Sequence, residues 1–145
     1  MYALDTNILV YAHNTGAKRH TEAKKFVQQV MNQRDKDGNL TVCKPSQVLI
    51  EFMNVITWSR LEAPLPLQDA IQVVKDYLAT GVTILHPLPT QLDTLLKLLK
   101  NETSRKKVFD IALVAILKDH KITGIYTVNT KDFKHYSFLD VKNPL

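Results

Sequence analysis

The 145-residue sequence predicts a three-layer α/β/α fold around a central parallel sheet of four to five strands. Short apolar segments rich in β-branched residues alternate along the chain with longer segments whose apolar residues recur at helical spacing. Hydrophobic residues make up 45% of the chain, and no internal repeat or low-complexity tract interrupts the pattern. This length and composition suit one hydrophobic core, so we expect a single domain over residues 1–145.

The first half of the chain is predicted to contain two strands. Its expected elements are a strand over 2–4, a helical turn over 8–12, an amphipathic helix over 17–33, a strand over 40–43 and a helix over 47–60. The helix over 17–33 follows from apolar residues at helical spacing between Ala23 and Met31. Pro45 and Ser46 are expected to start the helix after the second strand.

The second half is predicted to repeat the alternation. Its expected elements are a helix over 66–80, a strand over 82–85, a helix over 90–99, a helix over 105–120, a strand over 124–128 and a short fifth strand over 139–141. Gly81 is expected to stop the helix before it, and Thr90 to cap the next one. Ser104 is the candidate cap of the apolar helix over 105–120.

The charge balance favours an anionic partner. Nineteen Lys and Arg residues face fourteen Asp and Glu residues, and the sequence pI is about 9.3. Such an excess suits nucleic acid, although a basic surface that only keeps the protein soluble would give the same balance. Charge alone leaves both readings open.

Cysteine content and hydropathy limit the cellular compartment and the kinds of metal site that we expect. Cys43 is the only cysteine, which excludes an internal disulfide framework and a zinc site built from several thiolates. The sequence shows no secretory leader and no apolar run long enough to span a membrane. We therefore expect a protein of the reducing cytoplasm with no membrane partner.

Acidic side chains follow the predicted strands. Asp5 comes where the first strand ends, and Asn129 and Asp132 come where the fourth ends. In a sheet of this class, ligands bind outside the carboxyl ends of the strands, where the strand order reverses. These positions are therefore candidates for one shared site.

Two further carboxylates lie on predicted helices. Counting turns places Glu51 at the edge of an apolar face, where it is either a site residue or a surface group whose stem covers apolar atoms. Asp110 lies in the segment VFDIALVAIL, which is apolar nearly all round, so an unpaired carboxylate there would be costly. The structural alternative for Asp110 is a place in the first helical turn, which a cap at Ser104 would exclude.

Three carboxylates on separate elements suggest a metal site. Like charges gathered closely raise one another's pKa values unless a cation neutralises them. Oxygen ligands without a Cys or His cluster favour Mg²⁺ or Mn²⁺, held by Asp5 and Asp110. Glu51 would hold a water or act as a base, and Asn7 would orient Asp5 or a metal-bound water. Further auxiliary groups would come from Thr6, Thr127, Asn129 and Asp132.

Basic residues near these acids are candidates for holding an anionic partner such as nucleic acid. Arg105, Lys106 and Lys107 precede Asp110, and Lys131 and Lys134 flank Asp132. Phosphate contacts of this kind supply affinity and salt dependence, whereas the alternative is a solvated helix start and loop. Lys18 and Arg19 lie farther from the acids in sequence and are weaker candidates.

Four segments together resemble one known family. LDTNILVYA, QVLIEFMNVIT, FDIALVAIL and YTVNTKDF stand in the order and spacing of the PIN-domain nucleases, and more narrowly of the VapC-type toxins of toxin–antitoxin pairs. The resemblance implies a PIN-like fold and a metal-dependent endoribonuclease with Asp5, Glu51 and Asp110 as its acidic core. It also implies products with a 5′-phosphate and a 3′-hydroxyl.

The same resemblance carries expectations about partners and one departure. A VapC-type toxin would act on tRNA or ribosomal RNA, form a homodimer, and be inhibited by a small antitoxin whose tail enters the acidic groove. The family often has a fourth acid after the last core strand, where this chain has Asn129, with Asp132 three residues on. That substitution leaves open whether one metal ion or two would bind.

Competing classes fit less well. A phosphoacceptor domain would need an aspartate after the third strand, but TILHPL has none, and a phosphatase with a DxD motif would need an acid at Asn7. The remaining alternative is a noncatalytic RNA- or protein-binding module that keeps the PIN fold. Intact Asp5, Glu51 and Asp110 disfavour it, because three repelling carboxylates bring no benefit to a binding module.

Overall fold

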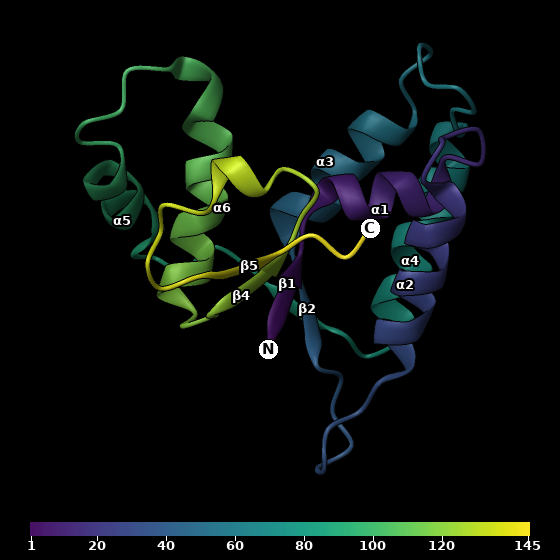
Figure 1. Ribbon diagram of the computed structural model, residues 1–145, viewed down its shortest axis with the longest axis horizontal. Coiled ribbons are helices and arrows are strands. Elements are labelled where there is room, and N and C mark those ends of the chain that lie inside the picture. The colour runs from purple at the N-terminus through teal and green to yellow at the C-terminus, as the bar shows by residue number, and fades with distance from the viewer.

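The computed structural model describes residues 1–145 and contains a five-stranded parallel sheet with the order β3-β2-β1-β4-β5 (Figure 1). Its elements are β1 (Tyr2–Leu4), α1 (Thr6–His13), α2 (His20–Asn32), β2 (Val42–Pro45), α3 (Ser46–Ile56), α4 (Leu67–Ala79), β3 (Thr83–Leu85), α5 (Gln91–Leu98), the 3-10 turn η1 (Arg105–Lys107), α6 (Val108–Asp119), β4 (Gly124–Tyr126), the 3-10 turn η2 (Thr130–Asp132) and β5 (Asp140–Lys142). The predicted α/β/α fold with a parallel sheet is confirmed, and the sheet has five strands.

The helices form two layers, one on each face of the sheet. From β1 the chain steps to β2 and then to β3 in one direction, whereas the step from β3 to β4 returns past β1. Because crossovers between parallel strands are right-handed, a reversed step places its helices on the opposite face. Figure 1 shows this arrangement: α1 to α4 lie on one side of the sheet, and α5 with α6 on the other.

The strand order places a crevice beside β1. This strand pairs with β2 on one side and with β4 on the other, and the direction of the connections reverses between β1 and β4. Ligand sites of doubly wound sheets lie outside the carboxyl ends of the strands at such a point. Asp5 follows β1 there, and Thr127 follows β4.

One hydrophobic core joins the sheet to both helical layers. It contains 26 buried residues, and every residue of α6 from Ile111 to Leu117 is buried. At about 25 cal/mol per Å² of apolar surface, this burial is the main force that holds the layers together. No helix has both the length and the apolar character needed to cross a bilayer.

Several predicted boundaries were wrong by a few residues. Helix α2 begins at His20 rather than at residue 17, because residues 15–19 form turns. Strand β2 covers 42–45 rather than 40–43, so Lys44 belongs to the sheet. Helix α3 ends at Ile56 rather than at residue 60, and the Leu65 amide closes the following turn by donating to the Ile56 carbonyl.

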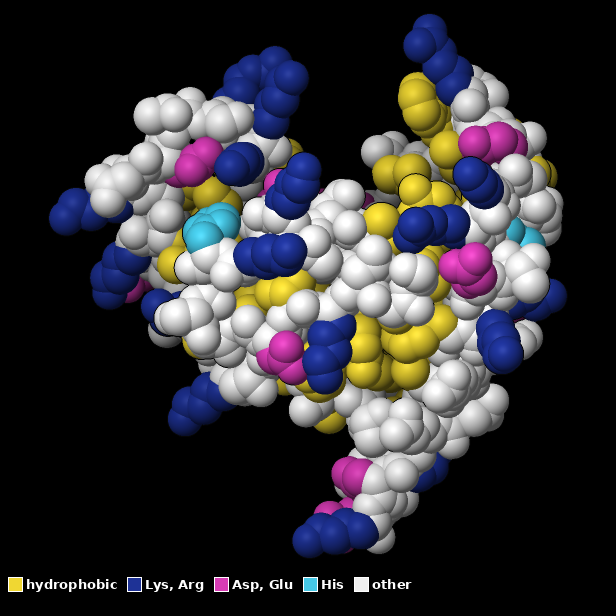
Figure 2. Space-filling view, in the orientation of Figure 1, with side chains coloured by type: hydrophobic (Ala, Val, Ile, Leu, Met, Phe, Trp, Pro, Cys, Tyr) yellow, Lys and Arg dark blue, Asp and Glu magenta, His cyan; other side chains and the backbone are white.

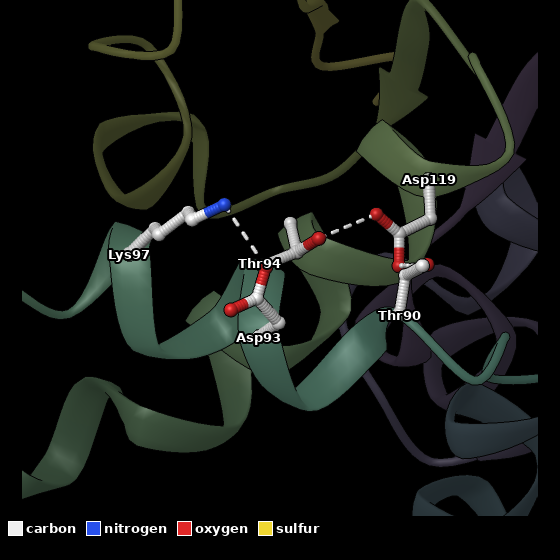
Figure 3. A network of polar contacts seen from close by, with 5 residues as sticks. All are labelled: Thr90, Asp93, Thr94, Lys97 and Asp119. Carbon is white, nitrogen blue, oxygen red and sulfur yellow. Dashed lines mark hydrogen bonds and ion pairs between the residues drawn. The ribbon is translucent and has the colours of Figure 1, made fainter.

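Two predicted caps were also wrong. The Thr90 side chain makes no cap bond to α5, and together with Thr94 it donates to the Asp119 carboxylate of α6, with O···O distances of 2.9 and 2.6 Å (Figure 3). The Asp93–Lys97 ion pair lies on the exposed side of α5. Ser104 caps nothing either, because residues 105–107 form η1 and α6 begins only at Val108.

Candidate active site

Asp5 is held at the junction of β1 and α1. It is the N-cap residue of α1, and its Oδ1 accepts a hydrogen bond of 2.7 Å from the Thr6 amide. Its Oδ2 accepts from Thr127 Oγ1 at 2.7 Å and from Asn7 Nδ2 at 3.0 Å. Burial raises the pKa of Asp5, because only 8% of the residue is exposed, and these donors act in the opposite direction.

Asn7 ties the end of β1 to the end of β4. Its Nδ2 also lies 3.2 Å from Thr127 Oγ1, and its Oδ1 accepts from the Val128 amide at 3.2 Å. Thr127 Oγ1 in turn accepts from the Asn129 amide at 3.0 Å. The two strand ends are therefore fixed relative to each other by side chains that converge on Asp5.

Glu51 is fixed from both sides by hydrogen bonds. Its Oε2 accepts from Thr6 Oγ1 at 2.8 Å, and its Oε1 accepts from Gln47 Nε2 at 3.2 Å. Gln47 lies one turn earlier on α3 and also donates to the Phe109 carbonyl at the start of α6. Glu51 is thus part of the strand-end network rather than only a surface group whose stem covers apolar atoms.

Asp110 lies in the first turn of α6, which corrects the expectation that a cap at Ser104 would place it deeper in the helix. Unlike Asp5 and Glu51, Asp110 makes no hydrogen bond or ion pair through its side chain. Partial burial, followed by the negative charges of Asp132, Asp5 and Glu51, raises the pKa of Asp110 to about 6. The first-turn position favours the charged form, so helix geometry and neighbouring charge act in opposite directions.

These side chains line one cavity of about 550 Å³ at the carboxyl edge of the sheet. The predicted site residues on its wall are Asp5, Thr6, Asn7, Glu51, Asp110 and Asn129. Thr127 lies behind Asp5, and Asp132 stands outside the wall but close enough to act on Asp110. The structure thus brings together residues from four separate segments of the chain.

None of the four main candidates for RNA binding lies in the wall of the cavity. Arg105, Lys106, Lys107 and Lys131 are exposed, and only Lys107 is close enough to lower the pKa of Asp110. Lys18, which its distance in sequence had made a weak candidate, lines the cavity. In the fold, the loop after α1 lies beside the site, and nothing in the local sequence predicts this position.

Sequence reasoning also missed a buried amide in the wall of the cavity. Asn14 is 3% exposed, donates to Glu62 Oε2 at 2.7 Å and accepts from the Ala63 amide at 3.1 Å. It joins the end of α1 to the turn after α3, and Gly16 packs so closely there that a Cβ would lie 2.7 Å from Glu62 Cβ. The sequence places Asn14 between His13 and Thr15, so the available signal was only an Asn at a helix end.

The donor set of the cavity suits a hard divalent cation. Carboxylate, hydroxyl and amide oxygens line it without Cys or His, and Asp110 carries a carboxylate destabilised by its neighbours. No three His, Cys, Asp or Glu side chains stand close enough together to hold a metal ion by themselves. Mg²⁺ commonly binds through one or two carboxylates and keeps several waters, so two carboxylates facing one cavity fit that ion.

Comparison with known proteins defines the class. The PIN-domain family model matches residues 2–139, nearly the whole chain. Ribonuclease VapC33 of Mycobacterium tuberculosis is 32% identical over 144 residues, which cover 97% of this chain and 96% of the relative. The chain therefore belongs to the PIN-domain family and, within it, to the VapC type.

Solved structures agree on the fold. The Mycobacterium tuberculosis toxin VapC20, described as cleaving the sarcin-ricin loop, superposes with a TM-score of 0.71 at 18% identity and covers 99% of this chain and 100% of its own. VapBC2 from Rickettsia felis, solved bound to a DNA fragment from its promoter, gives a TM-score of 0.64 at 18% identity and covers 98% and 97%. These likenesses extend over the whole length of each chain.

Proposed function

We propose that the protein is a Mg²⁺- or Mn²⁺-dependent endoribonuclease, the toxin of a toxin–antitoxin pair. The observation that carries this proposal is the convergence of Asp5, Glu51 and Asp110, from three separate elements, on one cavity. Membership of the PIN-domain family and the names of its relatives as ribonucleases support it.

Each carboxylate has a distinct part in this proposal. Asp5 and Asp110 would hold the cation, which when bound would polarise a phosphoryl oxygen and lower the pKa of a water. Glu51, oriented by Thr6 and Gln47, accepts the proton of the attacking water. Asn7 and Thr127 keep the Asp5 carboxylate turned toward the cavity by donating to its Oδ2.

The test is cleavage of tRNA and ribosomal RNA by the purified chain with Mg²⁺, with Mn²⁺ and with a chelator. We expect cleavage only with metal, and loss of cleavage in Asp5→Asn and Glu51→Gln. Asp93→Asn is the matched control, because Asp93 is an exposed carboxylate of α5 paired with Lys97. If wild type and Asp5→Asn bind RNA but leave it equally intact, the chain is a binding module and the nuclease proposal fails.

We propose further that two copies pair through the face formed by α3, α5 and α6. Ile50 is 64% exposed and Phe109 is 72% exposed, and both line a second hollow on this face. Glu51 and Val55 line this hollow and the acidic cavity alike, so pairing here would extend the wall of the site. Light scattering should give a dimer for the wild type and a monomer for Phe109→Ser.

A small antitoxin is the proposed protein partner, and the cytoplasm is the proposed location. The structural similarity to VapBC2 supports the partner, and the cytoplasm is where tRNA and ribosomal RNA are found. A basic tail of the antitoxin would be attracted to Asp5, Glu51 and Asp110. Addition of the protein encoded beside this gene should stop cleavage, and an Arg→Ala change in its tail should restore it.

A further inference from the structure

Trp58 is the only tryptophan of the chain, and it is 54% exposed. Tryptophan side chains are largely buried in most proteins, so a half-exposed one beside a cavity calls for an explanation. Trp58 follows α3 in a turn whose neighbours Val55, Leu61 and Glu62 all line the acidic cavity. The turn that carries Trp58 therefore borders that cavity.

The turn that carries Trp58 is fixed by hydrogen bonds at both ends. The Trp58 amide donates to the Val55 carbonyl at 3.0 Å, and the Leu61 amide donates to the Trp58 carbonyl at 3.1 Å. Farther along, Glu62 and Ala63 are bound by the buried Asn14 side chain. The backbone of Trp58 is thus held in place although its ring is open to solvent.

The charge around the ring suits a nucleotide. The Arg60 guanidinium lies 6.0 Å from the centre of the Trp58 ring, so a cation stands beside an exposed aromatic face. Figure 2 shows a hollow between the α6 side and the α3 side of the molecule, with Lys and Arg on both rims and hydrophobic side chains on one. Arg105, Lys106 and Lys107 are the exposed basic residues at the start of α6.

We propose that Trp58, with Arg60 beside it, is the platform on which an unpaired base of the RNA substrate stacks as the strand enters the cavity. This inference rests on the proposed ribonuclease function. Aromatic side chains in grooves for single-stranded nucleic acid stack bases of any sequence, while neighbouring basic groups contact phosphates. The guanidinium at the ring and the Lys and Arg on both rims of the hollow favour a polyanion, which is why we assign the platform to RNA.

The single tryptophan provides a direct measurement. Emission of Trp58, excited where tyrosine does not absorb, is followed while single-stranded oligoadenylate is added in the presence of a chelator, so that the RNA stays intact. We expect quenching as the base stacks on the indole. An abasic ribose-phosphate chain of the same length should bind through its phosphates without quenching the emission.

Binding of fluorescein-labelled oligoadenylate to variants separates stacking from charge. Trp58→Leu should weaken binding about ten- to hundredfold, the range that base stacking on one aromatic side chain supplies. Trp58→Tyr should recover most of this loss, and the loss should not depend on salt. Arg60→Ala should instead lower the slope of log K against log[salt] by about 1.

Leu67→Ala is the control, because Leu67 is an exposed apolar residue of α4 that lines neither the acidic cavity nor the hollow of the α3–α5–α6 face. The inference is overturned if Trp58→Leu binds and cleaves RNA as the wild type does, or if Leu67→Ala weakens binding equally. Quenching by the abasic chain would also overturn it. These outcomes differ from failure of the proposed function, in which neither wild type nor variant cleaves any RNA under any metal condition.

Discussion

Asp5 and Lys44 are charged residues near the carboxyl ends of neighbouring strands, and both are buried. Asp5 receives three hydrogen bonds, from one amide and two side chains. Lys44 is 0% exposed, and its Nζ has no hydrogen-bond partner. The nearest compensation is the Tyr77 ring, whose centre lies 4.3 Å from Nζ.

The two residues differ in how well the surrounding structure satisfies their polar atoms. Around Asp5 the donors include Thr127, which lies 122 residues farther along the chain, and they leave a carboxylate facing the cavity. Around Lys44 there is only a cation–π contact, and burial lowers the pKa of its ammonium group to about 7. Asp5 belongs to the candidate site, whereas Lys44 is a buried amine without a hydrogen-bond partner.

The largest expected effect concerns Asp110, the carboxylate of the candidate site that receives no hydrogen bond. Asp110→Asn should lower RNA cleavage at least about 100-fold, because it removes a proposed metal ligand. The same change should raise the free energy of unfolding, because it relieves repulsion from Asp132, Asp5 and Glu51. Cleavage assays and urea unfolding measure the two effects, and a less stable Asp110→Asn variant would contradict the second.

The next effect concerns the buried lysine. Lys44→Met should raise the free energy of unfolding at pH 7 by about 1–3 kcal/mol, because it replaces an unpaired buried amine with an apolar chain of similar length. Lys44→Ala should gain less, because it leaves a cavity beside Tyr77. Urea denaturation measures both, and destabilisation by Lys44→Met would show that the cation–π contact outweighs the burial cost.

The pH dependence of stability follows from the same lysine. Between the native pKa of about 7 and the ordinary value of 10.5, the unfolded chain binds one more proton than the folded chain. The free energy of unfolding should therefore rise with pH above 7, with a slope approaching about 1.4 kcal/mol per pH unit. The window to measure is pH 7–9, because burial also raises the pKa of Cys43 from 9.0 to about 12, which adds a further change at higher pH.

Lys44→Met supplies the comparison for that measurement. Its unfolding free energy should lose most of the rise between pH 7 and 9, because the titrating amine is gone. An equal rise in wild type and variant would assign the pH dependence to another group.

The smallest effect concerns one donor to Asp5. Thr127→Val removes the hydroxyl that donates to Asp5 Oδ2 and should lower the free energy of unfolding by about 1 kcal/mol. Thr127→Ser keeps the hydroxyl and should retain the hydrogen bond. Thr127→Val keeps a methyl group but loses every hydrogen bond of the hydroxyl, to Asp5, Asn7 and the Asn129 amide. Thermal unfolding measures the change, and a Thr127→Val variant as stable as the wild type would contradict the prediction.

The sequence predicts the region around Asp5 better than the region around Lys44, and the reason is physical. Asp5 interrupts an apolar segment, so an unusual residue type marks its position within the sequence itself. Lys44 stands next to Pro45, where a lysine is typical of the end of a strand, and the predicted strand stops at Cys43. Its burial depends on Tyr77 of α4, which local pattern cannot place against it.

The same limit explains the other misses. The α/β/α layering follows from periodicity, which extends over many residues and is detected reliably along the chain. Tertiary contacts decide the features that the sequence missed. They bring Lys18 to the cavity, and they leave Thr90 and Ser104 without a side-chain cap bond to α5 and α6. Such contacts are set by tertiary packing, and local preferences yield to it.

The placement of β1 in the middle of the sheet also governs when the site can first exist. Asp5 is synthesised before the strand on one side of β1, which ends at Tyr126, and before Thr127, whose hydroxyl holds the Asp5 carboxylate. A nascent chain therefore lacks the assembled cavity until Thr127 has left the ribosome. For the proposed nuclease, this order of synthesis means that the growing polypeptide has no assembled site with which to cleave RNA.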